Sequence, residues 1–184
     1  MSMKTYLKAL LFLIIFIILH SAYDLTHWSF LAPFCGVNES VFQHLKIAFW
    51  SYFFVSLIEY STVRRKLSRK FFWYPRLLSA ITVPWFAMLI WYLVPALHGR
   101  VESLALEVLW SILATYSSGI IGAVVEGNIE VISEFRLEFK IATLTLFVTS
   151  AFLYVWFTYN PPWIDVFINP EAVAVESSMV LKCF

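Results

Sequence analysis

The stretch LKALLFLIIFIILHSAY, from Leu7 to Tyr23, decides the fold class of this chain. Its one charged residue is Lys8, and its length approaches the about 20 apolar residues that a helix needs to cross a bilayer. The same character extends over the whole chain, because 61% of the 184 residues are hydrophobic and only 14% are charged. Soluble domains are about 45–50% apolar, so the sequence predicts an integral membrane protein.

Four further apolar segments follow the first. Together the segments predict an all-α fold, an integral membrane bundle of about five transmembrane helices in a single domain, 1–184. The second segment is short as an apolar run, from Ile47 to Ser61, but Asn38 can cap a helix that begins at Glu39 and lengthens it. The predicted spans are residues 7–23, 41–61, 77–95, 104–125 and 141–157.

Lysine and arginine are distributed unevenly over the two sides of this bundle. Ten lie on the side of the N-terminus and three on the opposite side, and loops rich in these cations stay in the cytoplasm. The predicted localisation is therefore the cell membrane, multi-pass, with a cytoplasmic N-terminus and an extracytoplasmic tail, 158–184. The ten are Lys4, Lys8, Arg64, Arg65, Lys66, Arg69, Lys70, Arg76, Arg136 and Lys140, and the three are Lys46, Arg100 and Lys182.

An acidic segment lies on the predicted cytoplasmic side. Residues 127–139 are predicted to form an amphipathic helix, because glutamates recur there at four-residue spacing opposite apolar side chains. These carboxylates would meet the basic loop from Arg64 to Arg76 or face solvent, while Glu59 would neutralise Arg64 or Arg65. The glutamates of the stripe are Glu126, Glu130, Glu134 and Glu138.

The partner that the composition predicts is the lipid bilayer. Anionic headgroups can bind the basic loop, whose cations include Arg64, Arg65, Lys66, Arg69 and Lys70. Nucleic acid is excluded as a partner, because the net charge is only +1. The basic loop is explained by its position on the predicted cytoplasmic side of the membrane. The sequence leaves open an oligomer or a partner subunit, and it leaves open whether Cys35 and Cys183, on the same predicted side, form a disulfide.

The residue types that do chemistry gather on the predicted outer side, which holds all four histidines. His20, Asp24 and His27 share one face of a helix, and two imidazoles with a carboxylate can bind a divalent metal ion. With His44 on the next helix, the predicted metal ligands are His20, Asp24 and His44. Haem is the less favoured cofactor. In the competing interpretation His20 bonds a neighbouring helix, and Asp24 and His27 lie among headgroups.

Two glutamates are the predicted catalytic residues. Glu39 would act as a general base at the start of the second helix, and Glu107, about one turn inside the fourth span, would donate protons. The structural alternatives are that the helix dipole favours the charge of Glu39, and that Glu107 reaches outward to Arg100 or water. The loop between Thr26 and Lys46 is apolar, so we expect it to be interfacial or re-entrant.

The string NESVFQHLK, Asn38 to Lys46, resembles the signature N-E-S-V-[F/W]-[E/Q]-H-L-K of a family of small, uncharacterised prokaryotic multi-pass membrane proteins. The string FTYNPPWIDVF, Phe157 to Phe167, is similar to the closing element of that family. With an early histidine in the first helix, the resemblance covers nearly the whole chain, except for the last residues after Phe167. The resemblance implies a multi-pass fold and does not suggest a reaction for the protein.

Three hypotheses for function follow from these features. The first is a membrane-embedded enzyme with a His/Asp/Glu site in the outer leaflet that acts on an amphiphilic substrate. The second is a non-catalytic scaffold or assembly subunit of a membrane complex. The third is a small-solute or proton transporter that uses Glu107, with Ser117 and Ser118 lining a polar path. The sequence leaves the choice between enzyme and scaffold open, because it does not show whether the outer polar residues converge.

Overall fold

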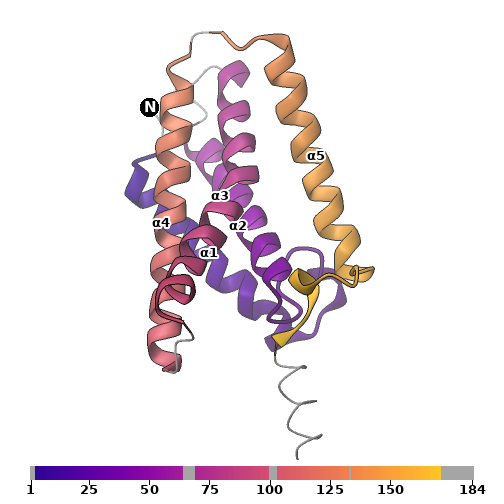
Figure 1. The fold of residues 1–184 in the computed structure, drawn as a ribbon. Helices are drawn as coiled ribbons and strands as arrows, with labels where there is room; N and C mark the ends of the chain where they lie inside the picture. Colours follow the sequence, from indigo (N-terminus) through magenta and orange to yellow (C-terminus); the bar gives the residue numbers. More distant parts are fainter. Residues whose placement is uncertain (1–2, 64–68, 100–102, 133, 171–184) are drawn as a thin grey trace, which may run out of the picture.

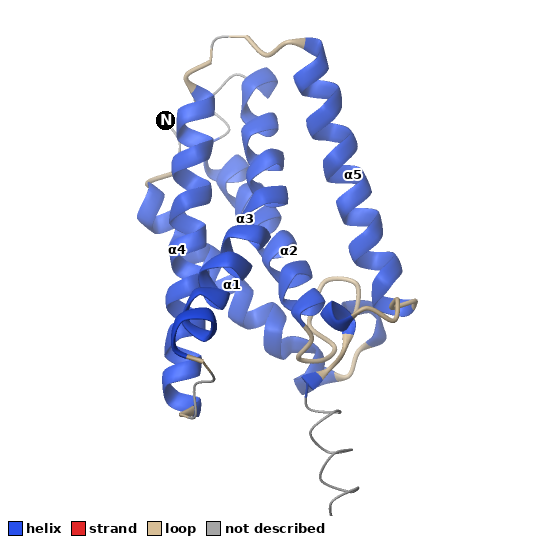
Figure 2. Ribbon diagram, viewed as in Figure 1, coloured by secondary structure: helices blue, strands red, loops and turns tan. Residues whose placement is uncertain are grey.

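The computed structural model describes residues 3–63, 69–99, 103–132 and 134–170. Among them are five long helices and two short 3-10 helices, so the predicted all-α class is confirmed (Figures 1 and 2). The long helices are α1 (Thr5–Thr26), α2 (Val41–Val63), α3 (Arg69–His98), α4 (Leu104–Glu130) and α5 (Leu137–Tyr159). The short ones are η1 (Ser29–Leu31) and η2 (Asp165–Phe167).

Each long helix contains a stretch long and apolar enough to cross a membrane, so the protein is a polytopic membrane protein. Even 22 residues of helix reach about 33 Å, which exceeds the about 30 Å of a hydrocarbon core. The segments of membrane-spanning length are Thr5–Thr26, Val41–Thr62, Phe72–His98, Leu104–Glu130 and Leu137–Tyr159. A bilayer is therefore the environment of this chain.

Two boundaries differ from the sequence prediction. The acidic segment 127–139 is not a helix of its own, because α4 continues to Glu130 and α5 begins at Leu137. The helix α2 begins at Val41 rather than at Glu39, because the side-chain oxygen of Asn38 accepts a hydrogen bond from the amide of Ser40 at 3.0 Å and forms a turn. Glu39 consequently lies before the helix instead of in its first turn.

Helices α1 to α4 form a closed ring of neighbours, in which each packs against the next and α4 packs against α1. Small residues permit the closest approaches: a Cβ atom on Gly119 would lie 2.7 Å from a ring carbon of Phe12, and one on Gly122 would overlap Val83. α5 stands at one side (Figure 1). It contacts α3, and its Phe147 and Tyr154 stack on Phe49 of α2.

Four buried charges close the ring of helices at one end, which we call the charged end. Each helix supplies one: Lys8 from α1, Glu59 from α2, Arg76 from α3 and Glu126 from α4. Lys8 Nζ lies 2.7 Å from both carboxylates, and Arg76 lies 3.0 Å from Glu59 and 3.3 Å from Glu126. The signs therefore alternate around the bundle, and the four charges balance.

Further contacts surround this charged ring. Glu130 also pairs with Arg76, and the hydroxyl of Tyr52 donates to Glu126 at 3.2 Å. Glu126 and Glu130 thus reach the last cation of the predicted basic loop. Among the described residues, the ion-pair partners of Glu59 are Lys8 and Arg76. Arg64, Arg65, Lys66 and Cys183 lie outside the described residues, as do the side chains of Arg69 and Lys70.

Candidate metal centre

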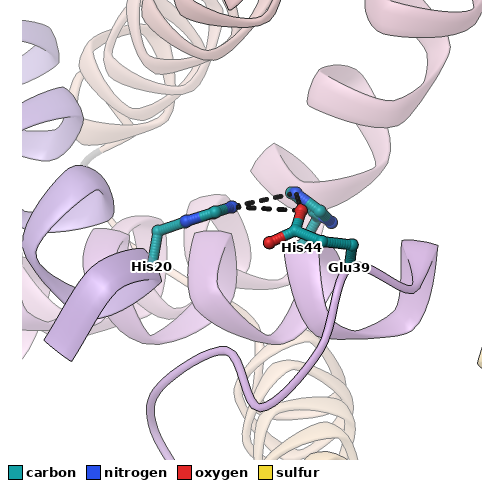
Figure 3. A group of neighbouring side chains, drawn as sticks. All are labelled: His20, Glu39 and His44. Carbon is teal, nitrogen blue, oxygen red and sulfur yellow. Dashed lines mark hydrogen bonds and ion pairs between the residues drawn. The ribbon is translucent and has the colours of Figure 1, made fainter. Parts of the chain in front are cut away.

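At the opposite end, which we call the histidine end, three side chains meet that are far apart in the sequence. His20 lies in the second half of α1, His44 in the first turn of α2, and Glu39 in the loop just before α2. Figure 3 shows all three pointing toward one another, with the loop passing below. The loop takes this path because the amide of Gly36 donates to the carbonyl of Leu19 at 3.2 Å, which ties it to α1 beside His20.

The facing atoms form a nearly regular triangle. Nε2 of His20 lies 3.2 Å from Nε2 of His44 and 3.6 Å from Oε2 of Glu39, while Nε2 of His44 lies 3.5 Å from the same oxygen. Each residue thus offers one ligand atom, and these atoms lie within 4.8 Å of one another. Among the described residues, His20, Glu39 and His44 are the histidine, cysteine, aspartate or glutamate side chains that lie close enough together, as a group of three, to hold a metal ion.

The size of this triangle matches one face of a coordination tetrahedron. Zinc binds imidazole nitrogen and carboxylate oxygen at about 2.0–2.1 Å, and a tetrahedral site with bonds of this length has edges of about 3.4 Å. The three measured edges of 3.2, 3.6 and 3.5 Å bracket that value. An octahedral site with the same bond lengths would have shorter edges of about 3.0 Å. The three distances are therefore compatible with one face of a tetrahedral site.

A backbone carbonyl sets the tautomer of His44. Nδ1 of this ring lies 3.0 Å from the carbonyl oxygen of Ser40, and a carbonyl can only accept, so Nδ1 carries the hydrogen and donates it. In the neutral imidazole the lone pair is then on Nε2, the atom that faces His20 and Glu39. This orientation is the one that a metal ligand requires.

The carboxylate of Glu39 is held in its ionised form. Its hydrogen bond with His20 lowers the pKa of Glu39 below the ordinary value, against the effect of partial burial. In this contact the imidazole of His20 is the donor, and because a metal ligand must be deprotonated, an ion bound here would displace that proton from Nε2. The side chains of His20, Glu39 and His44 are 32%, 37% and 40% exposed, which leaves the group open to an incoming molecule.

The structure brings together part of the predicted site. His20 and His44 lie in the group as expected, but the carboxylate beside them belongs to Glu39 and not to Asp24, which is exposed near the end of α1. Glu107 is exposed in the first turn of α4, and the group does not include it. His27 is also exposed and ends α1 in the left-handed region, with φ at 53°.

Sequence reasoning missed two features that matter here. It placed Glu39 at the start of the second helix as a general base and not among the metal ligands, whereas Glu39 precedes the helix and its carboxylate lies 3.5 Å from Nε2 of His44. It also missed the charged ring, although lone charges of opposite sign inside apolar segments, such as Lys8 and Glu126, were a usable signal.

No family model matches the chain, and neither a curated protein nor a solved structure matches it. The similarity of residues 38–46 to a family signature therefore stays a prediction. The local structure nevertheless gives a separate task to four polar residues of that string. Asn38 turns the chain, Glu39 and His44 supply ligand atoms, and the carbonyl of Ser40 orients His44.

Proposed function

We propose that the protein is a membrane-embedded metalloenzyme, in which His20, Glu39 and His44 hold one divalent ion in the outer leaflet and the substrate is amphiphilic. The single observation that carries this proposal is the triangle of ligand atoms, with edges of 3.2, 3.6 and 3.5 Å. Two features support it: the hydrogen bond that leaves a lone pair on Nε2 of His44, and the lowered pKa of Glu39.

The ligand set favours catalysis over a purely structural ion. Structural zinc sites have four protein ligands, whereas catalytic sites have three, commonly two histidines and a glutamate, and leave one position for water or substrate. Here three ligand atoms converge among the described residues. An ion in such a site lowers the pKa of a bound water to about 7, which generates a nucleophile for hydrolysis. Glu39 acts in this proposal as a ligand rather than as a free base.

The depth of the group supports an amphiphilic substrate. His20 precedes the end of α1 by six residues, or about 9 Å, and His44 follows the start of α2 by three residues, or about 5 Å. The two histidines therefore lie one to two turns inside the ends of these membrane-length helices, a depth that would suit a substrate with a polar head and an apolar tail. The outer leaflet is assigned from the excess of lysine and arginine on the other side of the bundle.

A second candidate function is a non-catalytic assembly subunit. The observation that favours it is that the three side chains also satisfy one another without an ion, because Glu39 lies within ion-pair distance of both histidines. In that case the contacts would serve to join α1 to the start of α2. The two candidates differ in whether the purified protein binds metal.

Metal content is the test. The full chain, purified in detergent and incubated with Zn²⁺, is expected to retain one ion per chain after removal of free metal, measured by elemental analysis. His20→Ala, His44→Ala and Glu39→Gln should each lower the affinity at least 10-fold, since each removes a ligand. His27→Ala is the matched control, because His27 is exposed and lies outside the group, and it should retain the ion.

Two outcomes decide between the candidates. A folded wild-type protein that binds no Zn²⁺, Fe²⁺ or Mn²⁺ would contradict the metalloenzyme and leave the assembly subunit. Binding that His27→Ala reduces as strongly as His44→Ala would show that the ion is held elsewhere. If one ion binds at the proposed site, the loaded protein is then tested for hydrolysis of lipids in vesicles, and the Glu39→Gln variant serves as the blank.

A further inference from the structure

We infer that Lys46 is a positioning residue for the metal centre: it holds the loop that carries Glu39 against the start of α2. This inference rests on the proposed function, because it assigns Lys46 a task at that same site. Lys46 follows the ligand His44 by two residues on α2, and it is fully buried, with 0% of its surface exposed. The chemistry proposed above does not use it.

The ammonium group of Lys46 joins three segments. Nζ donates to the carbonyl oxygen of Ala32 at 2.7 Å and to the hydroxyl of Thr158 at 3.0 Å. Ala32 belongs to the loop between α1 and α2, and Thr158 belongs to the last turn of α5. One side chain therefore links the loop, the ligand-bearing end of α2 and the end of the peripheral helix α5.

Stability alone is a poor explanation for a lysine at this position. Burying an ammonium group costs several kcal/mol in general, and a carboxylate repays more of that cost than the neutral oxygens of Ala32 and Thr158 do. A methionine of similar length would fill the same space without the desolvation cost. The specific property of Lys46 is that it can donate to a loop carbonyl and a hydroxyl together, which fixes geometry.

The geometry that Lys46 fixes includes the position of Glu39. The loop has two polar anchors among the described residues: the amide of Gly36 donates to the carbonyl of Leu19 on α1, and the carbonyl of Ala32 accepts from Lys46 on α2. Phe34 adds apolar contacts of the loop with Trp50 and Phe54 of α2. Hydrogen bonds are directional, so we expect the two polar anchors to hold Glu39 within the about 0.5 Å that a metal ligand requires.

The end of α5 supports the same region from the other side. Phe42, between Glu39 and His44 in the sequence, packs against Tyr154 and Phe157 of α5 and against Phe167 of η2, with ring centroids 5.7, 6.2 and 4.5 Å away. The hydrogen bond from Lys46 to Thr158 is the polar part of this junction. Removal of Lys46 should therefore loosen the loop and the end of α5 around an intact pair of histidines.

The test compares Lys46→Met with the wild type by two measurements. Zn²⁺ titration of the full chain in detergent is expected to show an affinity weaker by up to about 10-fold for Lys46→Met, the low end of the loss for a direct outer partner of a ligand, because Lys46 acts through the loop. Hydrogen exchange without metal should show faster exchange of the amides of residues 34–36, whose hydrogen bonds order the loop. The thermal midpoint of the metal-free variant should change little, because the relieved desolvation cost of the ammonium group offsets the two hydrogen bonds that are lost.

Lys140→Met is the matched control for the loss of one positive charge. Lys140 lies at the start of α5, at the charged end, and its replacement should leave both Zn²⁺ affinity and loop exchange unchanged. Lys46→Gln provides a second removal of the ammonium in case Lys46→Met is not recovered folded. If neither variant folds, Lys46 is required for the fold and the inference is overturned.

The two proposals fail in different ways. If the wild type binds no metal but the loop exchanges faster in Lys46→Met, the metalloenzyme fails while the task of Lys46 in ordering the loop stands. If the wild type binds Zn²⁺ and Lys46→Met binds it equally well with unchanged exchange, the positioning role is wrong and the metal site is unaffected. An equal loss of affinity in Lys140→Met would also overturn it, since charge alone would then account for the effect.

Discussion

Single residues around the loop determine how closely α1 and α2 approach at the histidine end. Gly36 is the tightest of these positions: a Cβ atom there would lie 2.9 Å from Cδ1 of Ile47 and 3.5 Å from the carbonyl oxygen of His20. Its φ is not in the left-handed region, so glycine is needed here for space and not for backbone conformation. Its amide also anchors the loop on Leu19, and space and anchoring therefore coincide at one residue.

Gly36→Ala should lower the free energy of unfolding by about 1 kcal/mol, the low end of the usual cost of inserting a methyl group into a packed site, because the atom that it meets is the far end of the Ile47 side chain. Ile47→Val removes the one carbon atom that the new methyl group meets, so Gly36→Ala should cost less in that background than in the wild type. Unfolding in detergent, followed by tryptophan fluorescence, measures the stability of the wild type, of each single variant and of the double variant. Additive effects would show that Ile47 is not the obstacle.

At the scale of the elements, small residues of α4 allow it to pack closely against three neighbouring helices. Gly119 faces Ala9 and Phe12 of α1, and Gly122 faces Val83 of α3 and Tyr52 of α2, where a Cβ atom would lie 3.0 Å from Cε2 of the tyrosine ring. Ala114, Ser118 and Ala123 are buried along the same helix. Small side chains at this spacing allow helix backbones to pack tightly in a membrane, where van der Waals contact replaces the hydrophobic effect.

Gly119→Ala and Gly122→Ala should therefore each destabilise the bundle, by about 1–3 kcal/mol. Gly127→Ala is the natural control, because no atom lies within 4 Å of a Cβ at that position in the same helix. Alanine is favoured over glycine inside a helix by up to about 1 kcal/mol, so Gly127→Ala should be neutral or stabilising. If all three variants behaved alike, helix propensity rather than packing would explain the result.

At the scale of the whole molecule, the bundle has two polar layers with different physical character. The charged end is a closed set of opposite charges that satisfy one another in a buried layer. The histidine end is partly exposed, and its three ligand atoms point at a common centre. The first arrangement holds four helices in one order and register, and the second leaves room for a ligand.

The charged ring predicts strong coupling between helices. Glu59→Gln or Lys8→Met alone should lower the free energy of unfolding by about 3–5 kcal/mol, because each removes a charge that pairs with two opposite charges and leaves the buried ring with an uncompensated charge. The double variant keeps the charges balanced between Arg76 and Glu126, so it should cost less than the sum of the single changes. The exposed pair of Arg136 and Glu138 is the control, and breaking it should change stability by less than about 1 kcal/mol. Equal effects in both pairs would contradict a stabilising ring.

The site could be predicted from the sequence only in part. The positions of His20 and His44 near the ends of apolar segments identified them, because segment ends can be read from composition alone. Asp24 was preferred to Glu39 because helix spacing makes residues four apart neighbours, and that rule cannot describe a loop. The choice of Glu39 depends on the return of the loop across α1, which is held by the hydrogen bond between Gly36 and Leu19.

The sequence by itself determined the membrane class and the five helices. Hydropathy is a local property, and a backbone in hydrocarbon must satisfy its own hydrogen bonds, which favours helices in each apolar segment. Only the tertiary structure decided which polar side chains meet. Glu39 joins His20 and His44, and Lys8 and Arg76 share Glu59 and Glu126, because long-range packing brings together residues that no local pattern relates.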